Sequence, residues 1–214
     1  MGVGEAIINK QSDRMQADIL VDNNSAVSED FSSLEEHFNQ ICNCQKCSLG
    51  KSRNKFVYGI GNPNADILFI GEAPGANEDL KGEPFVGRAG ELLDKILAAI
   101  QLSRQTVYIA NILKCRPPGN RDPLPEEREL CFPYLYKQID LIKPKFICTL
   151  GLVASQELLQ TKEPLGRLRK NWQNFRDIPV LVTYHPAALL RFPKYKRDTW
   201  EDMKKLKARY ESMR

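Results

Sequence analysis

Four cysteines of this sequence form two pairs that lie far apart in the chain. Two residues separate Cys44 from Cys47. Fifteen separate Cys115 from Cys131, and 67 lie between the two pairs. Thiolates at such spacings are typical of a tetrahedral zinc site or of an iron–sulfur cluster, and a shared site would close a long loop of the chain. Cys42 is a possible substitute ligand. The alternative is that these cysteines are unrelated free thiols.

Two glycine-rich segments and one histidine are further candidates for chemistry. Residues 71–75 (GEAPG) can turn sharply and present main-chain N–H groups to a ligand, although an ordinary strand-to-helix turn has the same composition. Residues 82–90 (GEPFVGRAG) hold Phe85 among small or rigid neighbours, where its ring can pack in the core or form a stacking platform for a base. His185 is one of two histidines and precedes Pro186, which predicts that it enters a helix. A lone histidine is more often structural than catalytic.

Four short apolar runs predict the strands that would position these residues. They are residues 65–70 (ADILFI), 107–112 (VYIANI), 146–150 (FICTL) and 180–184 (VLVTY). Apolar stripes at helical spacing predict helices over residues 92–100 and 200–213, the second one capped by Asp198 or Thr199. Because apolar strands alternate with helices, we predict a three-layer α/β/α fold with a central four-stranded parallel sheet and a four-cysteine subsite. Cys148, inside the third run, is expected to pack in the core.

Unusual residues follow each of the four predicted strands. They are the GEAPG segment, Asn111, Gly151 and residues 185–191 (HPAALLR). In open α/β sheets, ligands bind outside the carboxyl ends of the strands. We therefore expect four loops that are distant in the sequence to converge on one crevice.

The length and composition of the chain indicate one domain. A chain of 214 residues that is 42% hydrophobic can bury one sizeable core, which we expect over residues 31–214. Residues 33–36 (SLEE) have the form of a capping box and predict a short helix, whereas the polar and acidic residues 1–30 are expected to form a mobile leader. No apolar run approaches the ~18 residues of a membrane span, and no signal peptide is apparent, so we expect a cytoplasmic protein without membrane contact. Metal ligation is then a better interpretation of paired cysteines than disulfides.

The distribution of charge favours a polyanionic partner. Residues 1–40 hold 2 basic and 8 acidic side chains, whereas residues 161–214 hold 14 basic and 6 acidic ones. Such a basic balance favours binding of phosphates with release of counterions. The alternative is a well-solvated helical surface.

Five motifs then occur in a fixed order across residues 44–191. They are CxxCxL, GEAPGxxED, GxPFVGRAG, NxxKCRPPxNRxP with a later cysteine, and HPAALLR. In this combination the chain resembles the family 4 uracil-DNA glycosylases, the iron–sulfur branch of the uracil-DNA glycosylase superfamily. The resemblance implies a structural [4Fe–4S] cluster bound by Cys44, Cys47, Cys115 and Cys131.

The resemblance also implies the roles of the pocket residues. Phe85 would stack on a uracil flipped out of the DNA. The Asn111 amide would pair with N3–H and O4 of uracil, which cytosine does not match. Glu78 would crowd C5 and exclude the methyl group of thymine. His185 would donate a hydrogen bond to O2 and stabilise the leaving uracil anion, as the main catalytic residue.

The sequence departs from the superfamily pattern at the residue that orients the attacking water. The best-known members of the superfamily have an aspartate in the first motif, where this chain has Glu72 and Ala73 followed by Pro74. We expect these three residues to line the uracil pocket, with Glu72 as the catalytic candidate and Asp79 as a further possibility.

The last motif suggests contacts with DNA. Leu189, Leu190 and Arg191 resemble the wedge that fills the gap left by the extruded nucleotide. The alternative is an ordinary helix face. Lys194, Lys196 and Arg197 follow and can bind phosphates.

The sequence therefore predicts an enzyme that hydrolyses the N-glycosidic bond of deoxyuridine in single- or double-stranded DNA and acts as a monomer. One rival is the cluster-bearing branch that binds uracil-DNA covalently, but residues 79–83 leave no room for its basic, histidine-containing insertion. The other rival is a non-catalytic nucleic-acid-binding module with a four-cysteine zinc site.

Overall fold

A mixed sheet lies at the centre of the computed structural model, which describes residues 31–213. Its strands are β1 (Ile60–Gly61), β2 (Ile67–Gly71), β3 (Tyr108–Asn111), β4 (Phe146–Leu150), β5 (Gln173–Phe175) and β6 (Ile178–Thr183). They lie in the order β1-β3-β2-β4-β6-β5. The four inner strands, β3, β2, β4 and β6, are parallel and correspond to the four apolar runs of the sequence. The predicted acidic leader at residues 1–30 lies outside the described residues.

The two outer strands are the part of the sheet that the sequence analysis missed. β1 pairs antiparallel with β3, and β5 pairs antiparallel with β6. β1 is only two residues long, and β5 is largely polar, so neither one forms an apolar run. The turn between β5 and β6 holds Arg176 and Asp177 at φ angles of 49° and 67°. Positive φ at both positions is the geometry of a tight hairpin turn, which asparagine and glycine signal more clearly than these residues do.

Helices cover both faces of the sheet. They are α1 (Leu34–Ile41), α2 (Leu49–Ser52), α3 (Ala76–Lys81), α4 (Arg88–Ala99), α5 (Pro125–Ile142), α6 (Leu152–Leu159), α7 (Leu165–Leu168), α8 (Pro186–Arg191) and α9 (Lys196–Glu211), with short 3₁₀ turns η1 (Pro118–Asn120) and η2 (Pro193–Tyr195). Ser33 caps α1 as predicted, by accepting a hydrogen bond from the N–H of Glu36. The other half of the predicted capping box does not form, because the Glu36 carboxylate accepts from the N–H of Ser32 and not from that of Ser33. The predicted start of the last helix at Asp198 or Thr199 is wrong, because α9 already begins at Lys196.

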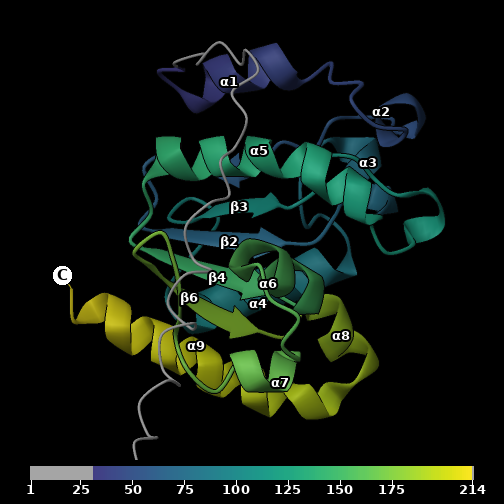
Figure 1. Ribbon diagram of the computed structural model, residues 1–214. Helices are drawn as coiled ribbons and strands as arrows, with labels where there is room; N and C mark the ends of the chain where they lie inside the picture. The colour runs from purple at the N-terminus through teal and green to yellow at the C-terminus, as the bar shows by residue number, and fades with distance from the viewer. Residues whose placement is uncertain (1–30, 214) are drawn as a thin grey trace, which may run out of the picture. The chain divides into compact units, whose positions relative to one another are not determined.

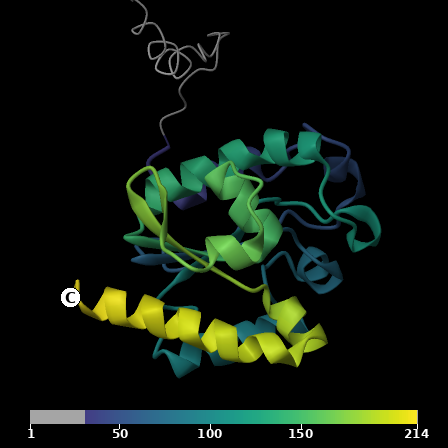
Figure 2. The same cartoon turned by 60° about the horizontal axis from the view of Figure 1, so that its bottom comes forward.

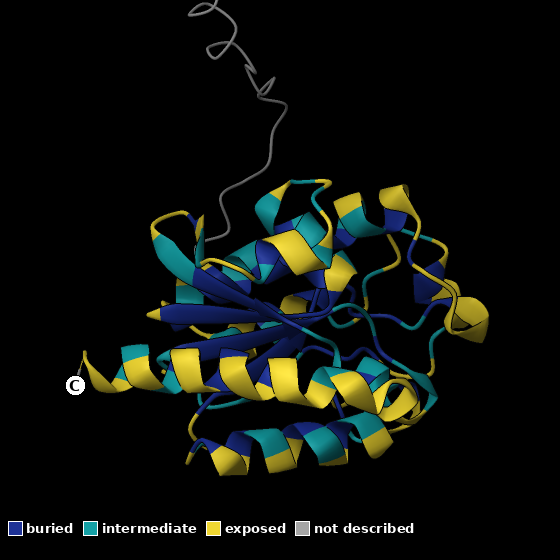
Figure 3. Ribbon diagram, turned by 90° about the horizontal axis from the view of Figure 1, so that it is seen from below, coloured by how far each residue is buried: buried dark blue, intermediate teal, exposed yellow. Residues whose placement is uncertain are grey.

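The core consists of two apolar layers, one on each face of the sheet. Along β2, Leu68 and Ile70 pack toward α5, α6 and α7, whereas Ile67 and Phe69 pack toward α4 and α9. This alternation follows from the two-residue period of a strand. α5 and α9 accordingly lie on opposite sides of the sheet (Figures 1 and 2). The inner strands between them are almost entirely buried (Figure 3).

A third apolar cluster joins α1 to α5 beside the sheet. It contains Phe56, Tyr58, Leu113 and Tyr134, and five cysteines also contribute to it or pack against it. Among the described residues, no helix has the length and apolar character that crossing a bilayer requires.

Candidate active site and cysteine site

One cleft opens at the carboxyl ends of the parallel strands, and its volume is about 790 Å³. It is lined by residues 72–75 after β2, Asn111 at the end of β3, residues 151–153 after β4, and residues 184, 185, 187 and 188 after β6. The four loops thus converge, as the pattern of strands and loops predicts.

Phe85 forms one wall of the cleft and is held in a constrained geometry. Its φ angle is 56°, a left-handed conformation that bulky residues rarely adopt. The ring packs on Gly71, where an added Cβ would lie 2.7 Å from Cζ of Phe85. The ring centroid lies 5.4 Å from that of His185. Phe85 therefore presents its ring beside the histidine in the same cleft.

Glu78 lines the cleft and also binds the backbone that follows Phe85. Its Oε1 accepts hydrogen bonds from the N–H groups of Val86 at 2.9 Å and Gly87 at 3.1 Å. The carboxylate thus braces the Phe85 loop, and its predicted contact with C5 of a bound base remains a prediction.

Asn111 is buried at the end of β3, beside Gly71 of β2. A Cβ added at Gly71 would lie 2.4 Å from Oδ1 of Asn111. The main-chain carbonyl of Asn111 accepts a hydrogen bond of 2.9 Å from Nζ of Lys114, which also donates to Oε1 of Gln138 at 2.5 Å. Lys114 is fully buried, and this burial lowers its pKa to about 8. The end of β3 is therefore tied to α5.

His185 caps the N-terminus of α8, with Pro186 in the first turn as predicted. The N–H of Ala187 donates to Nδ1 of His185 at 3.1 Å. Burial, followed by the nearby charge of Arg191, lowers the pKa of His185 to about 4, so the ring is neutral at pH 7. Because Nδ1 accepts a hydrogen bond, the proton of the neutral ring resides on Nε2, which can then act as a donor.

The two candidate acids near the first loop have different surroundings. Glu72 lines the cleft, and burial and then the charge of Asp122 raise its pKa. Asp79 is buried below the loop, where it accepts hydrogen bonds from the N–H and the side-chain amide of Asn54 at 2.9 and 2.5 Å. The surroundings of Glu72 thus suit contact with a ligand, and those of Asp79 suit support of the loop around Asn54.

The α8 residues proposed to contact DNA differ in exposure. The exposed fraction is 1% for Leu189 and 39% for Leu190. Leu190 and Arg191 line the cleft, whereas Leu189 packs into the protein. Lys194 lies exposed in η2, over the ring of Tyr195. Only Leu190 of the leucine pair therefore has the exposure that insertion into DNA requires.

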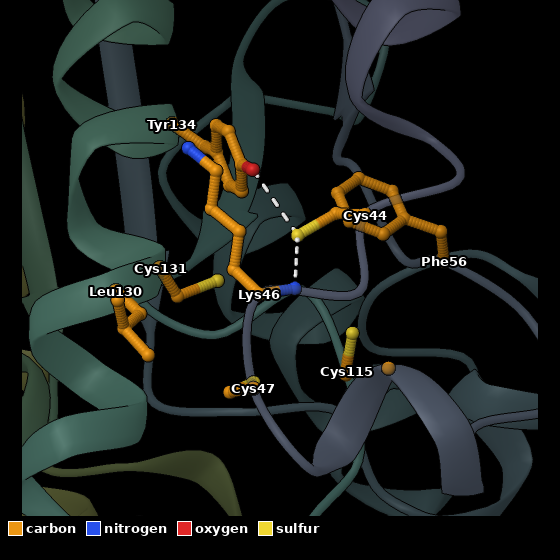
Figure 4. A pocket seen from close by; sticks show the side chains of 9 residues that line it. Cys44, Lys46, Cys47, Phe56, Cys115, Leu130, Cys131 and Tyr134 are labelled. Atoms are coloured by element: carbon orange, nitrogen blue, oxygen red, sulfur yellow. Dashed lines mark hydrogen bonds between the residues drawn. The ribbon is translucent and has the colours of Figure 1, made fainter.

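The two distant cysteine pairs meet at a second, much smaller cavity (Figure 4). The cysteines that line it are Cys44, Cys47, Cys115 and Cys131, and all six cysteines of the chain are free thiols. Cys42 packs against the same apolar cluster.

Polar hydrogens point at three of the four sulfur atoms. The Tyr134 hydroxyl donates to Sγ of Cys44 at 3.1 Å, and the N–H of Lys46 lies 3.5 Å from the same sulfur (Figure 4). The N–H of Lys114 donates to Sγ of Cys131, and Nη1 of Arg53 donates to Sγ of Cys115, both at 3.3 Å. Such donors suit sulfur atoms that carry negative charge.

Two properties of the cysteine site bear on what it can bind. Burial raises the pKa of the Cys115 thiol, and it raises that of Cys131 to about 12, so a metal would have to displace protons from both. Within residues 31–213, no group of three or more His, Cys, Asp and Glu side chains is arranged to hold one metal ion. A [4Fe–4S] cluster does not require that arrangement, because each of its four cysteines binds a different iron atom.

Several residues that shape the two sites escaped the sequence analysis. Arg53 binds the carbonyl oxygens of Cys42 and Cys44 as well as the Cys115 sulfur. Tyr184 lines the cleft next to His185 and stacks on Tyr195 at 4.2 Å. The position of Tyr184 directly before His185 was a usable signal, whereas the contacts of Arg53 have no periodic signature.

Comparisons of the sequence with known proteins indicate its family. The family model described as "Uracil DNA glycosylase superfamily" matches residues 58–204. The chain is 44% identical over 182 residues to the type-4 uracil-DNA glycosylase of Archaeoglobus fulgidus. This alignment covers 81% of this chain and 92% of that protein. It is 45% identical over 177 residues to the type-4 enzyme of Saccharolobus solfataricus (78% and 82% covered). It is 39% identical over 175 residues to that of Thermotoga maritima (79% and 90% covered).

Proposed function

This chain belongs to the uracil-DNA glycosylase superfamily, and on that premise we propose that it hydrolyses the N-glycosidic bond of deoxyuridine in DNA. It is a uracil-DNA glycosylase of the type-4 branch, which releases free uracil and leaves an abasic site for repair. The observation that carries this conclusion is the convergence of Phe85, Asn111 and His185 on one cleft.

The walls of the cleft suit recognition of a base taken out of the DNA stack. The Phe85 ring offers a stacking surface, and the Asn111 amide supplies one acceptor and two donors at its edge. An acceptor and a donor of this amide match N3–H and O4 of uracil, whereas cytosine presents an acceptor and a donor in the reverse order. β3 and Lys114 hold the Asn111 backbone, so the position from which the amide reaches into the cleft is fixed.

The chemistry that this site can supply is stabilisation of the leaving group. When the glycosidic bond breaks, negative charge develops on uracil, and O2 is the atom within reach of His185 in the proposed pose. The neutral ring keeps its proton on Nε2 because the N–H of Ala187 occupies Nδ1. A fixed donor aimed at developing charge typically contributes about 10²–10³-fold to the rate. Glu72 in the same cleft is the residue we propose to orient the attacking water.

We propose that Cys44, Cys47, Cys115 and Cys131 bind a [4Fe–4S] cluster. Their shared cavity and the donors directed at their sulfurs support this proposal. When bound, the cluster would crosslink the loops that carry these residues and would have a structural role. Purified protein should be brown and contain about four iron atoms per chain. Colourless protein with one zinc ion would refute the cluster and support the zinc alternative.

The basic C-terminal part of the chain supports a DNA partner. Leu190 is exposed at the rim of the cleft, and Lys194, Lys196 and Arg197 follow at the surface of η2 and α9. We propose that Leu190 enters the gap left by the flipped nucleotide while the basic residues bind phosphates. Strand preference, the monomeric state and the cytoplasmic location remain predictions.

The test is cleavage of an oligonucleotide with a single uracil, followed by alkali to cut abasic sites. Single- and double-stranded substrates are used with three proteins: wild type, His185→Ala and His37→Gln. His37→Gln is the control because His37 lies in α1 and does not line the cleft. If wild type and the control cut the DNA and His185→Ala cuts it roughly 10²–10³-fold more slowly, both the activity and the role of His185 are established. Cutting that survives in His185→Ala refutes the role alone. No cutting by metal-loaded wild type on either substrate refutes the activity and favours a nucleic-acid-binding module.

A further inference from the structure

The backbone around Phe85 is held from two sides by side chains outside its own loop. The left-handed φ of 56° at Phe85 is unfavourable for an aromatic residue, so the surrounding contacts must maintain it. The position of the ring in the cleft depends directly on this backbone. Residues that hold it therefore affect the base pocket without touching a base.

Arg104 holds the carbonyl side of this segment. Its Nη1 donates to the carbonyl oxygen of Pro84 at 3.1 Å, and its Nη2 donates to that of Phe85. Its Nε donates to Oδ1 of Asp94 in α4 at 2.6 Å, which fixes the guanidinium relative to that helix. A guanidinium presents its donors in a rigid fork, so one side chain can hold two adjacent carbonyl groups and a carboxylate at once.

The opposite side of the segment is equally constrained. Oε1 of Glu78 accepts the N–H groups of Val86 and Gly87. On the carbonyl side, a Cβ at Gly90 would lie 1.7 Å from the carbonyl oxygen of Phe85, so α4 packs directly against the group that Arg104 binds. Phe85 is thus fixed between Arg104, Glu78 and Gly90.

We propose that Arg104 is a positioning residue for uracil excision. It fixes the position of the Phe85 ring in the wall of the cleft and thereby sets the affinity for uracil. This inference rests on the proposed function. Arg104 is not among the described residues that line the cleft, so it acts through Phe85 and not by contact with the base. Asp94 contributes indirectly, because its carboxylate orients the guanidinium of Arg104.

The inference is tested with Arg104→Met, which retains a long apolar side chain but loses all three hydrogen bonds. The matched control is Arg176→Met, which also breaks an arginine–aspartate ion pair, with Asp140, in the turn between β5 and β6. Three quantities are measured: the inhibition constant of free uracil, and kcat and KM on the single-uracil oligonucleotide. We expect Arg104→Met to raise the inhibition constant and KM by about tenfold with a smaller change in kcat, because stacking on the ring is weakened. The control should stay within twofold of wild type.

A double-mutant cycle with Phe85→Ala separates positioning from a general loss of stability. If Arg104 acts through the ring, Arg104→Met should change uracil binding less than twofold once Phe85 is alanine. Equal effects in both backgrounds overturn the proposal. A defect that disappears at high salt also overturns it, because that result indicates a phosphate contact.

Arg104→Lys is the second variant, used if Arg104→Met does not fold. An ammonium lacks the planar fork of the guanidinium, so it cannot keep the two carbonyl groups and the Asp94 carboxylate in their present arrangement. A weakening of uracil binding is therefore again expected, and unchanged binding overturns the proposal. If wild type cuts uracil-DNA and both Arg104 variants bind uracil as tightly as wild type, this inference is refuted but the proposed function is not. Wild type that does not cut refutes the proposed function instead.

Discussion

Replacing Gly71 with alanine should disable the base pocket while leaving the fold in place. The added Cβ would lie 2.4 Å from Oδ1 of Asn111 and 2.7 Å from Cζ of Phe85. These distances fall short of the ordinary lower contact limit of 3.4 Å by 1.0 and 0.7 Å. Both neighbours must therefore move by up to about 1 Å, and a misplacement of that size costs roughly 10²-fold in rate. We expect kcat/KM on the single-uracil oligonucleotide to fall by about that factor.

The matched control is Gly166→Ala in α7, where nothing lies within 4 Å of the added Cβ. The control should retain wild-type kcat/KM, and its melting temperature should be equal to or above that of wild type, because alanine favours a helix. Circular dichroism of Gly71→Ala should remain that of a folded α/β protein. If folded Gly71→Ala cuts within threefold of wild type, the contacts of Gly71 do not set the pocket geometry and the reasoning is refuted.

Three further predictions follow from the burial and the pKa shifts of single residues. Leu190→Ala should lose more activity on double-stranded than on single-stranded DNA, because the wedge offsets unstacking, and equal losses would contradict that role. Burial raises the pKa of Glu72, and the ionised form of this residue would orient the water. The excision rate should therefore decrease toward acidic pH, with a midpoint above the ordinary glutamate pKa of about 4.3. Glu72→Gln should remove this acid limb, and its persistence would exclude Glu72 as the group responsible. Burial also lowers the pKa of His37 to about 4 in the folded protein. In the unfolded chain the His37 ring has its ordinary pKa of about 6.5 and binds a proton more tightly. The free energy of unfolding should therefore fall as pH drops from about 6.5 to about 4. Chemical denaturation at several pH values should show a smaller fall in His37→Gln, and an equal fall would contradict the assignment.

The central strands could be predicted because burial on both faces leaves a direct trace in the sequence. Every position of β2, β3 and β4 is buried, so each strand reads as an apolar run. The edge strands β1 and β5 bury less and were missed. The start of α9 was misplaced because its first turn follows η2 directly and has no side-chain cap for the sequence to reveal.

The candidate site was predictable where function depends on loops at strand ends, and less so where it depends on contacts between distant side chains. The convergence of the four loops follows from parallel topology alone. The hydrogen bonds from Arg104 to backbone carbonyls 19 and 20 residues away follow from no sequence pattern. Nor could a helix of six residues reveal from its sequence that Leu189 points inward and Leu190 outward.

The order of the strands also determines when the two sites can form during synthesis. All four cysteines of the small cavity have been synthesised once residue 131 is added, whereas the cleft still lacks β6 and His185. Each central strand pairs through a long crossover, and such non-local pairings form slowly. The cleft is therefore completed by the last third of the chain, when β6 docks on β4. During refolding, helical signal should return before uracil excision, and a chain that stops before β6 lacks His185 and has no means of cutting DNA.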